Sequence, residues 1–299
     1  MKNYVSIVRN NAAIDTTIIS KGEVVDGVFN YFGGRLEDIA AIGDELLDLP
    51  LLTTPRLGMV GCPANAQKGV IDTVNRLRGY VSPEKVYKGF FDFYEKAAEV
   101  GIKLIISDKD GVLKEGGNKE GSERFRQLAL EMGQEGKPYV VVLTGSSHQQ
   151  NLPFMRDFGL DERLSVNPAV RKYPYLLLCE NGAIHLNVLT GETRNYVADI
   201  SPELLKALKG KFESRVRKKI ETEVLPFFGF EWSKDYDDQR GKVYHVLDKQ
   251  SMVTFNVPRE FSDGTPYRKT KNADMFRDRV VEKMEETAQE LGLPYKIVR

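Results

Sequence analysis

The stretch LIISDKDGVLKEGG, residues 104–117, joins a buried strand to a pair of carboxylates. Residues 104–107 are apolar or small, as expected for a strand that is covered on both faces. Asp108 and Asp110 follow at the end of this strand, where parallel sheets bind ligands. Side chains two residues apart on a strand point the same way, and neighbouring carboxylates repel each other. We therefore expect a cation between them, and Mg²⁺ suits a site with few carboxylates and several waters.

Short apolar segments alternate with amphipathic ones on either side of this stretch. The pattern predicts strands at 4–8, 39–44, 56–61, 103–108 and 138–145, and helices at 21–33, 65–77, 89–101 and 121–136. A strand, a turn and a second strand are predicted over 175–194. This alternation favours an α/β domain with a parallel sheet of Rossmann-like type.

The pattern changes after residue 195. A long charged helix is predicted at 201–230, an antiparallel hairpin at 242–258, a second amphipathic helix at 273–292 and a last strand at 294–299. Strands that alternate between apolar and polar residues, with helices on one side, are typical of a small α+β layer. We assign residues 1–195 to the α/β core and residues 196–299 to a second, smaller domain.

Composition excludes several classes of protein. The 299 residues carry a formal net charge of zero, so no overall charge favours nucleic acid or an anionic membrane as a partner. No apolar run approaches the roughly 18 residues of a membrane span, and the N-terminus lacks a signal peptide's apolar segment. Cys62 and Cys179 are expected to be buried free thiols in a reducing compartment. The sequence predicts a cytoplasmic protein and leaves its oligomeric state open.

Four segments together resemble the motifs of the haloacid dehalogenase superfamily. LIISDKDGVL (104–113) is similar to the first motif, and VVVLTGSS (140–147) to the second. SKGEVVDGVF (20–29) is similar to the third, a Lys-Gly that opens a helix, and AAIGDELLDLPLL (40–52) to the fourth. The resemblance implies a core of that superfamily with a smaller cap domain.

The order of these motifs differs from that of the family. The third and fourth motifs precede the first, and the chain ends within the expected cap. Joining Arg299 to Met1 restores the usual order. We therefore interpret the chain as a circular permutant, bridged over 79–89, a kind of rearrangement that folded domains tolerate at exposed sites.

The resemblance also implies catalytic roles. Asp108 would be the nucleophile that forms an aspartyl-phosphate, and Asp110 the general acid and base. Lys21 would neutralise charge between the nucleophile and the phosphate. Thr144 and the backbone amide of Gly145 would hold the phosphoryl oxygens.

A magnesium site is implied as well. Asp44 would bind Mg²⁺ directly. Asp48 would act nearby, either through water or by holding Lys21. Asp108 and Asp110, the latter through its backbone carbonyl, complete the expected set of metal ligands.

The insertion after the second motif resembles the C2B-capped branch, which includes phosphatases of sucrose, trehalose and mannosylglycerate phosphates. It contains the turn CENGA (179–183). Glu180 and Asn181 either contact the substrate there or form a polar turn with Gly182 at positive φ. The second motif has Thr-Gly-Ser-Ser where these phosphatases often have Thr-Gly-Arg, which leaves the substrate open.

The expected function is that of a Mg²⁺-dependent phosphoric monoester hydrolase acting on a small phosphorylated metabolite, with a sugar phosphate as the favoured class. One alternative is a phosphotransferase similar to the phosphomannomutases, which share the cap type and the aspartyl-phosphate chemistry. The other is a non-catalytic binding protein of the same fold. The intact pair Asp108 and Asp110 argues against the non-catalytic alternative.

Overall fold

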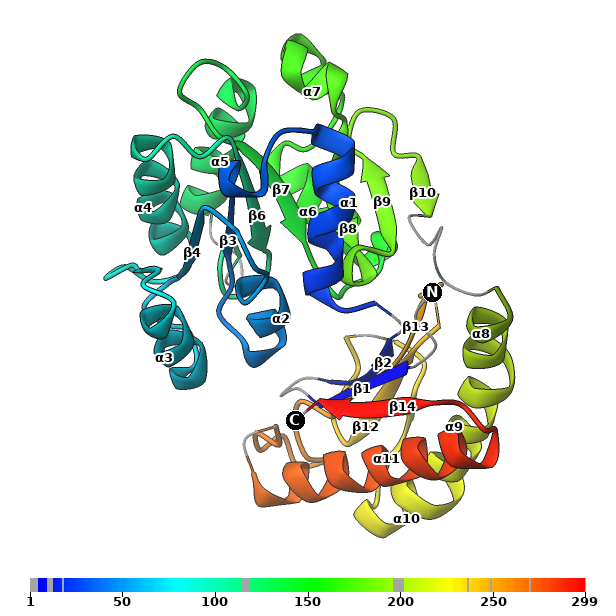
Figure 1. The fold of residues 1–299 in the computed structure, drawn as a ribbon. Helices are drawn as coiled ribbons and strands as arrows, with labels where there is room; N and C mark the ends of the chain where they lie inside the picture. Colours follow the sequence, from blue (N-terminus) through cyan, green and yellow to red (C-terminus); the bar gives the residue numbers. More distant parts are fainter. Residues whose placement is uncertain are drawn as a thin grey trace. The chain divides into compact units, whose positions relative to one another are not determined.

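The computed structural model describes residues 5–9, 13–17, 19–114, 119–195, 202–235, 237–247, 249–268 and 270–298. The chain divides into two compact units (Figure 1). The larger unit is Ser20–Val197, and the smaller one combines Met1–Ile19 with Ala198–Arg299.

The larger unit is built on a sheet of eight strands in the order β10-β9-β8-β7-β6-β3-β4-β5. The parallel strands are β3 (Ile39–Ile42), β4 (Met59–Cys62), β5 (Tyr80–Val81), β6 (Leu104–Asp108), β7 (Tyr139–Leu143) and β8 (Tyr175–Cys179). Two antiparallel strands, β9 (Ile184–Asn187) and β10 (Thr193–Asn195), extend one edge. The predicted α/β class with a mostly parallel sheet, as in Rossmann-like folds, is confirmed.

One helix precedes the first strand of this sheet, and others connect its strands. They are α1 (Val24–Phe32), α2 (Leu49–Leu52), α3 (Lys68–Arg76), α4 (Val86–Glu99), α5 (Lys119–Glu131), α6 (His148–Phe158) and α7 (Pro168–Lys172). Every residue of β3, β6 and β7 is buried, which means that both faces of the sheet are covered. Cys62 and Cys179 are buried and free, as the sequence predicts.

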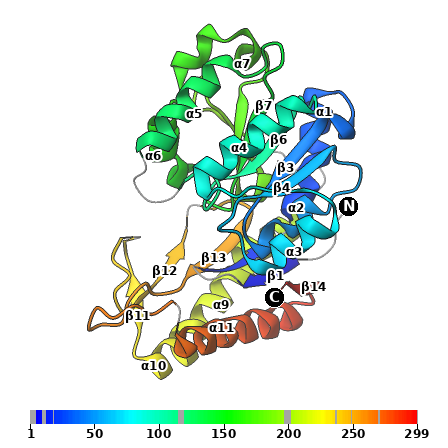
Figure 2. The same cartoon turned by 90° about the vertical axis from the view of Figure 1, so that its left-hand side faces the viewer.

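The smaller unit has its own sheet, of six strands in the order β11-β12-β13-β2-β1-β14. These are β1 (Val5–Arg9), β2 (Ala13–Thr17), β11 (Glu231–Ser233), β12 (Lys242–Val246), β13 (Met252–Asn256) and β14 (Tyr295–Val298). A helical segment runs from α8 (Pro202–Ala207) through α9 (Glu213–Lys219) to α10 (Leu225–Phe228), with π-helical turns at Leu208–Phe212 and Ile220–Val224. It packs beside α11 (Lys271–Glu290) against the sheet (Figure 1 and Figure 2).

The boundary of the units differs from the predicted division at residues 195 and 196. The N-terminal strands belong to the smaller unit, because β2 pairs with β13 and β1 pairs with β14. Ile7 and Ile14 join a core whose other members, such as Phe212, Phe255 and Phe276, come from the C-terminal part of the chain. The chain therefore passes between the units twice, at 19–20 and at 197–198.

The remaining elements of the smaller unit follow the sequence pattern, except for β11, which was not predicted. The predicted helices at 201–230 and 273–292 correspond to α8–α10 and α11, and the predicted hairpin at 242–258 corresponds to β12 and β13. Among the described residues, none of the helices combines the length and the apolar character that crossing a membrane requires.

Candidate active site

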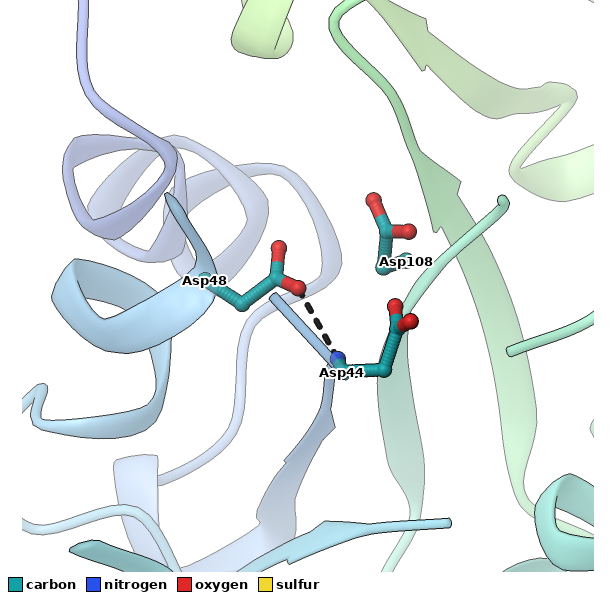
Figure 3. Close-up of side chains that lie close together, drawn as sticks. All are labelled: Asp44, Asp48 and Asp108. Carbon is teal, nitrogen blue, oxygen red and sulfur yellow. Dashed lines mark hydrogen bonds between the residues drawn. The ribbon is translucent and has the colours of Figure 1, made fainter. Parts of the chain in front are cut away.

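Three aspartates meet at one edge of the larger unit's sheet. Asp108 is the last residue of β6, and Asp44 follows the neighbouring parallel strand β3, whose Ile42 is paired with Ser107. The carboxyl ends of parallel neighbours lie together, which brings these side chains to one place. Figure 3 shows the side chains of Asp44, Asp48 and Asp108 side by side. Each is buried, and each offers an oxygen within 4.8 Å of those of the others.

Asp48 owes its place to a tight turn after β3. Its Oδ2 accepts hydrogen bonds from the backbone amides of Asp44 and Glu45, both at 3.0 Å, and Figure 3 marks the first of them. A Cβ atom on Gly43 would lie 2.4 Å from the Cβ of Asp48. Glycine at this position therefore lets the turn fold back on the strand end.

Lys21 provides the positive charge at the site. Its Nζ donates to Asp48 Oδ1 at 2.6 Å and also to Asp108 Oδ1. The lysine is itself buried and begins the turn that leads into α1. A Cβ atom on the following Gly22 would lie 2.4 Å from the backbone oxygen of Pro50, so glycine is needed for this close packing. Asp48 thus holds Lys21, one of the two roles predicted for it.

Burial and mutual repulsion shift the protonation of this cluster. Burial, followed by the charges of Asp108 and Asp48, raises the pKa of Asp44 to about 9. Burial also raises the pKa of Asp108, although Lys21 beside it acts in the opposite direction. For Lys21, burial lowers the pKa, but the two carboxylates it contacts outweigh that effect and leave the pKa raised.

Asp44 is the member of the cluster whose charge is least compensated. Its Oδ1 is buried and has no hydrogen-bond partner among the described residues. Within the same part of the chain, Lys21 lies in ion-pair range of Asp48 and Asp108 but not of Asp44. Three buried carboxylates with one ammonium leave a negative charge that a bound cation would neutralise.

The loop after Asp108 packs directly against Asp44. Gly111 has a φ of 83°, and a Cβ atom there would lie 2.1 Å from Asp44 Oδ2. Asn65, in the loop after β4, donates its Nδ2 to the backbone oxygen of Gly111 at 2.9 Å and accepts from the amide of Val86 at 2.7 Å. Asn65 was not predicted from the sequence, although its place just after a strand of the same sheet is a signal for it.

Asp110 does not join the cluster in this structure. Its side chain is 63% exposed, and its Oδ2 lies 3.1 Å from Lys109 Nζ. The expectation that Asp108 and Asp110 point the same way assumed that the strand continues to residue 110. The strand ends at Asp108, and the chain turns so that the amide of Gly111 donates to the oxygen of Lys114 at 3.0 Å. The Asp110 carboxylate is therefore not among the clustered carboxylates, while the expected metal ligation by its backbone carbonyl and its acid–base role stay predictions.

Thr144 and Gly145 lie at the end of β7, the strand next to β6. Thr144 is buried, and its Oγ1 accepts a hydrogen bond from the amide of Ser146 at 3.1 Å. Its backbone oxygen accepts a hydrogen bond from the amide of Asn181 at 2.9 Å, and the backbone oxygen of Ser146 accepts one from the amide of Glu180 at 3.0 Å. These two hydrogen bonds connect the turn that follows β7 to the turn that follows β8.

Glu180 and Asn181 form a turn in the left-handed region, with φ of 52° and 58°, and Gly182 follows at 95°. Left-handed backbone at non-glycine residues is often found at functional sites. Glu180 is fully buried, which favours the polar turn over substrate contact for this residue. The Oδ1 of Asn181 lies 3.4 Å from the position that a Cβ on Gly145 would take, so Asn181 lies against the turn after β7.

Comparisons of the chain with protein family models, with curated proteins and with solved structures gave no match. The residues at the sheet edge therefore carry the functional proposal.

Proposed function

We propose that this protein is a Mg²⁺-dependent phosphatase of the haloacid dehalogenase superfamily, with its motifs in permuted order. Its substrate would be a small phosphorylated metabolite, with a sugar phosphate as the favoured class. The observation that supports this most is the contact between Lys21 and Asp108, which are 87 residues apart in the chain and lie beside Asp44 and Asp48 at one sheet edge. A carboxylate held by a lysine next to further carboxylates suits phosphoryl transfer, which depends on positioning and charge stabilisation.

The residues present fit a magnesium ion. Mg²⁺ prefers hard oxygen ligands and keeps several waters, so one or two carboxylates are enough to hold it. Asp44 and Asp108 would hold it, because Asp44 has an unpartnered buried oxygen while Asp48 is engaged with Lys21 and two amides. When bound, the ion would neutralise charge on the carboxylates and on the phosphoryl oxygens.

The chemistry of the chain's own residues follows in two halves. A carboxylate oxygen of Asp108 attacks phosphorus and forms an aspartyl-phosphate, while the bond to the leaving oxygen breaks and Asp110 gives that oxygen a proton. Asp110 then takes a proton from water as the water attacks phosphorus, which frees inorganic phosphate and regenerates Asp108. Lys21 orients Asp108 and offsets negative charge throughout. The Asp110 side chain is largely exposed, so a leaving group that enters from solvent is able to reach it.

Turnover of p-nitrophenyl phosphate tests this proposal. The wild-type protein is expected to release p-nitrophenol with MgCl₂ and to lose that activity in EDTA. Asp108→Asn is expected to abolish turnover, because an amide does not form the acyl phosphate, and Asp110→Asn to lower kcat about 10² to 10⁴-fold. Asp92→Asn is a matched control, since the Asp92 carboxylate accepts from the hydroxyls of Tyr80 and Ser82 and lies outside the cluster. Full activity of Asp108→Asn, or activity that EDTA leaves unchanged, would contradict the proposal.

A further inference from the structure

Lys109, between the two motif aspartates, is a second buried lysine at this sheet edge. Only 5% of the residue is exposed. Its Nζ lies 2.8 Å from Asn151 Oδ1, 3.1 Å from Asp110 Oδ2 and 3.4 Å from Ser146 Oγ. An ammonium group has three N–H donors, so each has an acceptor within reach.

One partner of Lys109 is its neighbour in the chain, and the other two come from the segment after β7. Asp110 belongs to the loop after β6, Ser146 to the turn after β7, and Asn151 to the first turns of α6. Asn151 is fixed in its turn, because its Nδ2 donates to the backbone oxygen of Ser147 at 2.7 Å. The Lys109 ammonium also lies 5.7 Å from the centre of the Phe154 ring. The lysine therefore ties the loop that carries Asp110 to the turn that carries Thr144 and Gly145.

A purely structural role does not call for a lysine at this position. An apolar side chain in this buried position would pack against Phe154 without the desolvation cost of an ammonium group. The charge matters for the carboxylate it meets. The Asp110 side chain is mostly exposed, and a short exposed carboxylate has many orientations unless a partner selects one.

We propose that Lys109 is a positioning residue for Asp110, an inference that rests on the proposed phosphatase function. The ammonium holds the Asp110 carboxylate beside the nucleophile loop and in a fixed relation to the turn at Thr144–Ser146. Lys109 touches neither the substrate nor the reacting atoms and acts through Asp110. Misplacing a catalytic group by about 1 Å is enough to cost on the order of 100-fold in rate.

The test is a double-mutant cycle on p-nitrophenyl phosphate turnover. Lys109→Gln keeps a donor for Asn151 but removes the charge that Asp110 faces. We expect kcat to fall roughly 10- to 100-fold, with KM changed less than about threefold. In an Asp110→Asn background the same substitution is expected to lower kcat by less than about threefold, because the group it acts through is already lost. If Lys109 had only a structural role, the substitution would lower kcat by the same factor in both backgrounds.

Lys283→Gln is the matched control. Lys283 is also buried and ion-paired, with Glu223 and Glu286, but belongs to the other compact unit, and its substitution is expected to leave kcat unchanged. A second measurement applies even if Lys109→Gln fails to fold. In acetic anhydride labelling of the wild type, Lys109 is expected to react at least about tenfold more slowly than Lys103, whose side chain is 75% exposed.

Each outcome has a defined meaning. An active wild type in which Lys109→Gln has no effect, or lowers both backgrounds equally, overturns the role of Lys109 and leaves the phosphatase proposal standing. Equal labelling of Lys109 and Lys103 overturns the role as well. A wild type without phosphatase activity refutes the proposed function, and the role of Lys109 with it.

Discussion

Replacing Asp44 by asparagine should make the metal-free protein more stable at neutral pH. Asp44 is buried beside two other carboxylates, and its pKa rises from 3.8 to about 9. A carboxyl group whose pKa is raised on folding makes its full contribution to the free energy of unfolding below its pKa in the unfolded chain. That contribution is lost as the pH rises through its pKa in the folded protein. About three pH units separate 3.8 from pH 7, and each is worth about 1.4 kcal/mol. The free energy of unfolding of the metal-free wild type is therefore about 4 kcal/mol lower at pH 7 than below the unfolded pKa of Asp44.

Asparagine has nearly the same shape as aspartate and does not titrate, so Asp44→Asn should escape that loss. The measurement is urea or thermal unfolding in EDTA at pH 5, 7 and 8.5. The advantage of Asp44→Asn over the wild type should grow with pH between about 4 and 9 and then level off. At pH 7 an advantage of about 4 kcal/mol corresponds to a rise in Tm of roughly 8–16 °C for a unit of this size.

Magnesium should reverse the order of stability of the wild type and Asp44→Asn. A cation binds the ionised carboxylate, so MgCl₂ is expected to stabilise the wild type increasingly as the pH rises, and to add much less to Asp44→Asn. Asp161→Asn is a control for which the expected change in stability has the opposite sign, because hydrogen bonds from Arg163 hold the pKa of Asp161 below its usual value. That variant should be less stable than the wild type at pH 7. Parallel pH profiles of Asp44→Asn and wild type in EDTA, or equal stabilisation of both by MgCl₂, would refute the reasoning.

Two further substitutions probe the same cluster. Gly111→Ala should cost about 1–2 kcal/mol from its left-handed φ of 83°, and the new Cβ should push Asp44 aside. Titration with MgCl₂, followed by unfolding, should then show weaker stabilisation than in Gly136→Ala, a glycine with a similar φ of 71° and an open surrounding. Lys21→Met should cost about 3–5 kcal/mol in EDTA, because it leaves Asp48 and Asp108 buried without their cation. A loss below about 1 kcal/mol in urea unfolding would show that Lys21 does not compensate these charges.

The central parallel strands of the larger unit's sheet were predictable because they are short and mostly apolar. Residues 39–42, 104–108 and 139–143 are buried on both sides, so their composition indicates strands without help from the rest of the chain. The strand β2 was not predicted. Its sequence AIDTT includes Asp15 and two threonines, and these polar side chains are accommodated only by the tertiary structure, as when Thr254 donates to Asp15.

The site was predictable up to the point where the strands end. Asp44 and Asp108 follow neighbouring strands, and the sheet order alone brings them together. Asp110 lies beyond the end of β6, where the alternation of side chains no longer applies. Lys109 escaped notice for a related reason, since a lysine at a strand end usually reaches solvent. Its burial depends on Asn151 and Ser146, which come from a segment that local sequence does not connect to it.

The proposed permutation of the motifs leads to a test in the smaller unit, where Arg299 would meet Met1. There β1 and β14 are parallel neighbours, with Ile7 beside Ile297 and Val8 beside Val298. A connection between parallel neighbours takes a dozen or more residues, so fusing Arg299 directly to Met1 does not suit both strands. The sequences SIVR (6–9) and KIVR (296–299) are nearly the same, which indicates that one strand is able to replace the other.

We therefore predict that a chain lacking residues 1–9, with Arg299 joined to Asn10 and a new opening between the exposed Pro83 and Glu84, folds. In this chain β14 would take the place of β1 beside β2. Tyr295 is paired with Val5 and Ile297 with Ile7, so Tyr295 and Ile297 would face the core that now holds Val5 and Ile7. Circular dichroism and urea unfolding measure the outcome, and MgCl₂ should stabilise this chain as it does the wild type. The control keeps residues 1–9 and joins Arg299 to Met1 through about fifteen glycines and serines. If only the control folds, β14 does not replace β1; if neither folds, the permutation is wrong, because a rearranged chain of the same fold should tolerate its original order.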